Sequence, residues 1–256
     1  MKSYREFIIE SYSDIKSICE KYRITNYTIN SDGSIDVDGD VDLSEKRITK
    51  LPLKFRNVRG DFYCSYNQLT ALEGGPKTVG GDFNCYNNQL TTLKGCPKTV
   101  GGNFNCGNNQ LTTLEGGPQS VGGGFYCRNN QLTTLEGSPQ TVGGNFNCSN
   151  NQLTTLEGGP RSVGGNFYCS NNQLVNLNGF LEDFEDDISL EDDISLDNNP
   201  VSEIYNLFKD YKCIKWLNEF DVIQGDRVIM DRLEEVYHQL GMNIPENIEF
   251  RNYEII

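Results

Sequence analysis

The sequence predicts an α/β solenoid, in which short repeats coil around one continuous hydrophobic core and helices lie mainly at the ends. Within the 256-residue chain, a 21-residue unit recurs from residue 60 to residue 179. A fixed period in this range is typical of solenoids and other repeat arrays. One cysteine column marks the period, at Cys64, Cys85, Cys106, Cys127, Cys148 and Cys169.

Each repeat contains the pattern of a short strand. In its Phe-x-Cys unit the two apolar side chains are two positions apart, so they point to one face of a strand. The Leu-Thr-x-Leu stretch that follows adds two more apolar side chains to the interior. One coil cannot bury these groups alone, so stacking is expected to form a parallel sheet with strands about 4.8 Å apart. A valine closes each coil from the far side, at Val79, Val100, Val121, Val142 and Val163.

Polar and conformationally special residues mark the turns. An asparagine follows each strand, and we expect its side-chain amide to bond to backbone groups of the turn, coil above coil. The Gly-Gly pairs, beginning at Gly80, are expected either to adopt positive φ or to let neighbouring backbones approach closely. Prolines exclude helix from the return side, where extended or polyproline-like arcs are expected. The asparagine column is Asn67, Asn88, Asn109, Asn130, Asn151 and Asn172.

Burial accounts for the cysteine column. The N-terminus resembles no signal peptide and the chain has no long apolar run, so we expect reduced thiols rather than disulfides. Free cysteine behaves as a small hydrophobe, and the column occupies a position that points into the core. A metal centre would need several ligands close together, which one cysteine per repeat does not supply. No metal and no cofactor is therefore expected.

Residues 1–40 are predicted to form an N-terminal cap made of a helix and a hairpin. A capping box begins at Ser3, and a helical apolar stripe continues to about Arg23. Two strand patterns, around Tyr27 and Ile35, then flank a Ser-Asp-Gly turn. Such a cap would shield the open edge of the first coil, as solenoids require for solubility.

The solenoid is predicted over residues 41–199, with about eight coils and an acidic insertion at residues 180–193. Near its end the stretch Glu-Asp-Asp-Ile-Ser-Leu occurs twice in succession, at residues 185–190 and 191–196. Both copies could supply the final strand. The second is followed by the paired asparagines of the repeat, which favours Ile194 and Leu196. The first copy would then be an extra strand or an acidic loop.

Residues 200–256 are predicted to form an α+β C-terminal cap. Helices are expected over residues 201–208, 210–220 and 231–240, and Gly241 would end the last of them. A hairpin is expected over residues 221–229, turning at Gln224-Gly-Asp. No element is assigned to residues 242–256.

The net charge of −14 is concentrated at one end. Residues 180–256 carry 20 acidic and 6 basic side chains, whereas residues 1–179 are close to neutral. The negative electrostatic potential of this end disfavours direct binding to nucleic acid or to an anionic membrane. The acidic segment is interpreted either as a solvated face or as an imitation of a phosphate backbone that competes for a nucleic-acid-binding protein. Its residues are Glu182, Asp183, Glu185, Asp186, Asp187, Glu191, Asp192 and Asp193.

The sequence does not predict an enzyme. His238 is the only histidine, so a triad would depend on a single residue in a predicted helix. No phosphate-binding loop, dinucleotide fingerprint or HExxH motif occurs. Binding to another molecule is the function that remains.

The outward positions of the repeat strands are the candidate binding surface. They combine Tyr and Asn with one cation, a composition that resembles adaptable antibody loops. Tyr126 with Arg128 is the best candidate anchor, since Tyr and Arg are common hot-spot types. The alternative is that Tyr and Asn stand here only because strands tolerate them. The predicted partner-binding residues are Tyr63, Asn84, Tyr86, Asn105, Tyr126, Arg128, Asn147 and Tyr168.

The frame Phe-x-Cys-x-x-Asn-x-Leu-x-x-Leu, as in residues 83–93, resembles the short bacterial leucine-rich repeat over about half the chain. This resemblance implies a right-handed coil with one parallel sheet and a mostly non-helical convex side. The full sequence of the repeat, together with residues 35–43 and 219–223, is also similar to leucine-rich-repeat proteins of tailed bacteriophages.

A phage origin implies a location in the bacterial cytoplasm. The partner would then be a host protein, such as a defence factor that the phage protein inhibits. The resemblance supplies no catalytic residues. A structural role in the virion stays open as an alternative, and oligomeric state is not predicted.

Overall fold

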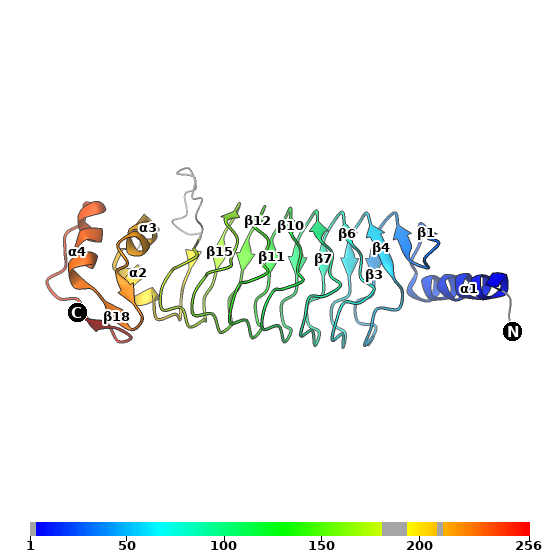
Figure 1. Ribbon diagram of the computed structural model, residues 1–256, viewed down its shortest axis with the longest axis horizontal. Coiled ribbons are helices and arrows are strands. Elements are labelled where there is room, and N and C mark those ends of the chain that lie inside the picture. The colour runs from blue at the N-terminus through cyan, green and yellow to red at the C-terminus, as the bar shows by residue number, and fades with distance from the viewer. Residues whose placement is uncertain (1–3, 181–193, 209–211) are drawn as a thin grey trace.

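The computed structural model describes residues 4–180, 194–208 and 212–256, with residues 4–11 described as backbone only. The chain forms an elongated rod, in which a coil of stacked turns separates a helix at the N-terminal end from a small α+β cap at the C-terminal end (Figure 1). The solenoid predicted from the 21-residue period is therefore confirmed.

One parallel sheet, which we name the phenylalanine sheet, contains the predicted Phe-x-Cys strands. Consecutive strands pair with a 21-residue offset, as Phe62 with Phe83 and Phe83 with Phe104. In the described residues it has eight strands. They are β3 (Val41–Asp42), β5 (Phe62–Tyr63), β7 (Phe83–Asn84), β9 (Phe104–Asn105), β11 (Phe125–Tyr126), β13 (Phe146–Asn147), β15 (Phe167–Tyr168) and β16 (Ile194–Ser195).

The last strand of this sheet uses the second copy of the duplicated hexapeptide. Phe167 pairs with Ile194 rather than with a residue 21 positions later, and Leu196 is buried. The preferred register is therefore confirmed. The first copy, at residues 185–190, lies outside the described residues.

A second sheet, which we name the valine sheet, replaces the arcs that were predicted for the return side. Its strands are two to four residues long and keep the valine inward, which is too short a pattern to identify from sequence. Among the described residues this sheet also has eight strands. They are β1 (Tyr27–Ile29), β2 (Ile35–Val37), β4 (Phe55–Val58), β6 (Thr78–Val79), β8 (Thr99–Val100), β10 (Ser120–Val121), β12 (Thr141–Val142) and β14 (Ser162–Val163).

The Gly-Gly pairs form the corner between the two sheets, where consecutive coils nearly touch. A Cβ added at Gly101 would lie 2.0 Å from the carbonyl oxygen of Gly80 in the preceding coil. No positive φ occurs at Gly101, so close backbone approach is what requires glycine at this corner. Positive φ falls instead on the glycine two residues before each proline position, such as Gly95 at +91°.

Stacked aromatic rings form the centre of the core. The rings of Phe83 and Phe104 lie 5.4 Å apart and are inclined by only 8°, and the neighbouring pairs repeat this arrangement. Phe55 and Phe180 close the two ends of the stack with edge-to-face contacts. The core therefore continues through every repeat, as the stacking argument predicts.

The buried asparagine column joins successive coils, as predicted. Asn109 donates from Nδ2 to the carbonyl oxygens of Cys85 (3.2 Å) and Cys106 (3.0 Å), and its Oδ1 accepts from the backbone N–H of Leu90 (3.0 Å). Equivalent bonds repeat along the column, and Asn199 continues them into the last coil. Each of these side chains thus satisfies backbone groups in two coils.

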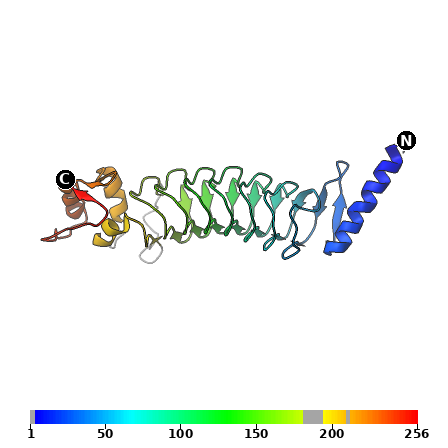
Figure 2. The ribbon, with the colours of Figure 1, turned by 90° about the horizontal axis from the view of Figure 1, so that it is seen from below.

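The N-terminal cap consists of α1 (Tyr4–Tyr22) and the β1–β2 hairpin. Strand β2 pairs in parallel with β4, so the hairpin extends the valine sheet. Ile15 and Cys19 of α1 are buried against this end. The N-terminal part of α1 extends beyond the coil in both views (Figure 1, Figure 2).

The C-terminal cap contains helices α2 (Ser202–Phe208), α3 (Lys212–Glu219) and α4 (Met230–Gln239). The predicted hairpin is β17 (Ile223–Gln224) with β18 (Arg227–Val228). The tail that the sequence left unassigned forms β19 (Glu254–Ile255), which pairs in parallel with β18. The hydroxyl of Tyr253 donates to the carbonyl of Val175 at 2.8 Å, so the tail fastens the cap to the solenoid.

The cysteine column predicts thiols that do not react in the folded protein. Cys106 has no exposed surface, and burial raises the pKa of its thiol above the ordinary 9.0. Because the thiolate is the reactive form, we expect iodoacetamide at pH 8 to leave the six repeat cysteines unlabelled. Mass spectrometry of peptides from native and from guanidine-unfolded protein would check this. Rapid labelling of the native column would contradict it.

Candidate interaction face

The outer side of the phenylalanine sheet carries the predicted partner-binding residues. The middle residue of each strand points away from the core, and all of these side chains are half-buried. Because the strands are fixed by the stacked core, the face presents its side chains in a rigid row. The middle column is Tyr63, Asn84, Asn105, Tyr126, Asn147 and Tyr168.

A second polar ladder, which sequence reasoning missed, lies along one edge of this face. Each of its side chains accepts the backbone N–H of the next coil through Oδ1, as Asp61 does from Asp82 at 2.7 Å and Asp82 from Asn103 at 2.7 Å. The column has Asp or Asn in every coil except at Gly124. This recurrence at one position of the repeat is the signal that could have revealed the ladder. The ladder is Asp40, Asp61, Asp82, Asn103 and Asn145.

The tyrosines of the middle column lean toward this ladder. The hydroxyl of Tyr63 donates to Asp61 at 2.6 Å, and the hydroxyl of Tyr168 accepts from Asn166 at 2.6 Å. Tyr126 fills the space over Gly124, where an added Cβ would lie 2.6 Å from its hydroxyl oxygen. The three rings therefore lie along one side of the face, and hydrogen bonds hold the hydroxyls of Tyr63 and Tyr168.

The asparagines of the middle column have a local structural role. In Asn84, Asn105 and Asn147 the Oδ1 accepts the backbone N–H two residues later at 3.0 Å. This bond shapes the end of the strand within the same coil. These three residues are therefore explained in part by the fold, as the alternative interpretation of the sequence allowed.

Tyr63 gives a pH-dependent prediction. Its hydrogen bond to Asp61, with some loss of solvation, raises its pKa from 10.0 to about 12. The stabilising contribution of this bond is fully present below pH 10 and is lost as the pH rises toward 12. We expect Asp61→Asn to shift one phenol ionisation in the ultraviolet titration back toward pH 10. An asparagine keeps the ladder acceptor, as Asn103 shows, and superimposable titration curves would contradict the prediction.

The structure places one residue of the predicted anchor near a third predicted residue. Arg128 is exposed, and its guanidinium carbon lies 5.9 Å from the ring centroid of Tyr86, two coils earlier. Tyr86 also makes an edge-to-face contact with Tyr66, at 5.6 Å between centroids. Tyr66 was not among the predicted residues although 52% of its surface is exposed.

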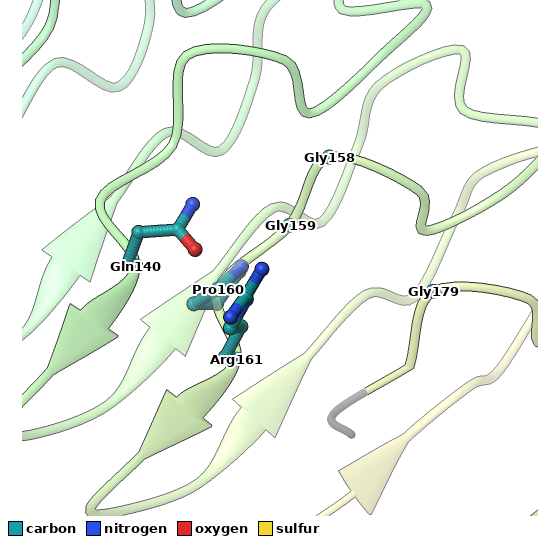
Figure 3. A pocket seen from close by; sticks show the side chains of 6 residues that line it. All are labelled: Gln140, Gly158, Gly159, Pro160, Arg161 and Gly179. Carbon is teal, nitrogen blue, oxygen red and sulfur yellow. The ribbon is translucent and has the colours of Figure 1, made fainter. Parts of the chain in front are cut away.

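A small cavity lies outside the phenylalanine sheet. This cavity, at the edge of the valine sheet, has a volume of about 210 Å³ and is lined by Gln140, Pro160, Arg161 and three glycines (Figure 3). Its one charged group is an exposed arginine, so it holds no acid–base pair. No group of His, Cys, Asp or Glu among the described residues could hold a metal ion. The acidic segment predicted at residues 182–193 lies outside the described residues.

Over the parts of the chain that the structure describes, no helix has the length and apolar character needed to cross a membrane. Comparison with known proteins finds no matching family model, no matching curated protein and no matching solved structure.

Proposed function

We propose that this protein is a non-enzymatic interaction module that binds a protein partner with the outer face of the phenylalanine sheet. The observation that supports this most is the row of half-buried Tyr side chains on a rigid sheet, with short polar side chains between them. Aromatic rings held in this way provide large contact areas at a low cost in conformational entropy. The bacteriophage origin, the host or defence factor as partner, and the cytoplasmic location follow from the resemblance of the repeat and stay predictions.

Partner capture from bacterial lysate, at low and at high salt, tests the choice of surface. Contacts between packed aromatic and polar groups survive high salt, whereas contacts with an acidic segment weaken steeply because salt screens exposed charges. A partner retained at high salt would therefore favour the phenylalanine sheet. A partner lost with salt would favour the nucleic-acid mimic that was predicted from residues 182–197.

Removal of two rings from the face should weaken binding. With the captured partner, we expect Tyr126→Ala combined with Tyr168→Ala to raise Kd by roughly 30-fold or more, since buried Tyr residues at interfaces commonly contribute about 2 kcal/mol. Isothermal titration calorimetry would measure the change. Thr99→Ala, which truncates an exposed side chain of the valine sheet, is the matched control. Equal affinity of the double variant and the wild type would exclude this face.

A further inference from the structure

The departures from the repeat gather at one edge of the phenylalanine sheet. The residue after the strand cysteine is serine in three of the six coils, at Ser65, Ser149 and Ser170. In the three consecutive coils between them it is Tyr86, Gly107 and Arg128. One position later these six coils all have asparagine except the first, which has Tyr66, and the preceding coil of β3 has Glu45.

These substituted positions meet in space. Tyr66 contacts the ring of Tyr86 edge to face, with the rings inclined by 67°, and Arg128 extends over the same ring from the other direction. The coil between Tyr86 and Arg128 has Gly107, and Tyr86 packs closely over the position that a side chain would occupy there. A Cβ at Gly107 would lie 3.3 Å from Cδ2 of Tyr86 and 3.1 Å from the carbonyl oxygen of Arg128.

The fold does not require this cluster. Tyr66 has φ of +54°, a left-handed conformation that the preceding coil gives to Glu45 and the later coils give to asparagine, which tolerates it better. Its backbone N–H bonds to the next coil at 3.0 Å, and Asn87 makes the equivalent bond at 3.1 Å. The coils with serine and asparagine at these positions therefore build the same turn. A strained aromatic residue with half of its surface exposed indicates a functional requirement.

The chemistry of the cluster defines its ligand. The two phenol rings form an apolar shelf. Across the described residues, no carboxylate forms an ion pair with Arg128, so its guanidinium is available as a two-pronged donor. On the same coils, Asp61 and Asp82 line the opposite edge of the face and disfavour a polyanion such as nucleic acid. An apolar group joined to a single carboxylate fits these features.

We infer that Tyr66, Tyr86 and Arg128 form the anchor site for the partner and bind an extended peptide segment in which an aromatic side chain lies beside a carboxylate. The inference rests on the proposed function, because it assigns one edge of the same face. The ring of the ligand packs on Tyr66 and Tyr86, and its carboxylate accepts hydrogen bonds from Arg128.

A random peptide library displayed on yeast, selected on the immobilised full-length protein, provides the test. Each variant returns one residue to the type found in other coils: Tyr66→Asn, Tyr86→Ser and Arg128→Ser. These changes keep the core and the turn, and thermal melting should show each variant at least as folded as the wild type. Lys94→Glu, which restores the glutamate of neighbouring coils outside this edge, is the matched control.

We expect enrichment of peptides with an aromatic residue next to Asp or Glu. Their affinity should fall at least roughly tenfold in each of the three variants and stay unchanged in Lys94→Glu. Selected peptides that bind all three variants as well as the wild type, but lose affinity in Tyr126→Ala or Tyr168→Ala, would overturn the anchor site and leave the proposed function standing. Absence of any enriched peptide would count against both. Binding of oligothymidine that depends on Tyr66 and Arg128 would instead assign the edge to base stacking.

Discussion

Replacing Asn109 with alanine is expected to lower the free energy of unfolding by about 3 kcal/mol, because the change leaves several buried backbone groups without partners. The N–H of Leu90 and the carbonyl oxygens of Cys85 and Cys106 all bond to this side chain, of which only 9% is exposed. Urea denaturation followed by circular dichroism would measure the loss.

Gln110→Ala is the matched control for this experiment, because Gln110 is the next residue in the chain but its side chain is exposed. We expect it to change the free energy of unfolding by less than about 0.5 kcal/mol. If Asn109→Ala were as mild as the control, the column would not join the coils in the way described.

Phe104→Ala is expected to have the largest effect, a loss of about 4 kcal/mol. The ring has no exposed surface and lies between Phe83 and Phe125, at 5.4 and 5.2 Å between centroids. Truncation removes its apolar contacts and leaves a cavity that neighbouring coils cannot fill, because their backbones are already in contact at the glycine corners. Guanidine denaturation would measure the loss.

Phe104→Leu serves as the comparison, since it keeps most of the apolar volume and should lose less than about 1.5 kcal/mol. Hydrogen exchange would show where the damage lies. In a solenoid each coil contacts only its neighbours, so we expect amides of adjacent coils to exchange faster while those near the C-terminal cap stay protected. A loss below about 1 kcal/mol for the alanine variant would contradict close packing of the stack.

Much of the fold could be predicted because every repeat carries the same pattern of apolar and polar residues. The Phe-x-Cys pair fixes which side chains face inward, and the asparagine after it is of a type that bonds to backbone groups of a turn. The register of the last coil was predictable for the same reason, since Asn199 marks the end of β16 as Asn172 marks the end of β15.

The candidate site could be predicted only in part. The sequence identified the outward positions, because alternation along a strand determines them. It paired Arg128 with Tyr126, two residues away, and did not indicate that the guanidinium lies over Tyr86, 42 positions earlier in the chain. A long side chain on a solenoid can extend past the neighbouring coil where that coil has glycine. The spacing of residues within one repeat does not reveal such a contact between coils.

The sequence by itself determined the solenoid, its period, the inward residues, the buried cysteine and asparagine columns and the composition of the outer face. These follow from local periodicity, which needs no knowledge of neighbouring coils. Only the tertiary structure decided that the valines form a second sheet, that the glycine corners require close approach rather than positive φ, and that Tyr66 joins Tyr86 and Arg128. Each of these depends on contacts between coils, and such contacts exist only once the repeats have stacked.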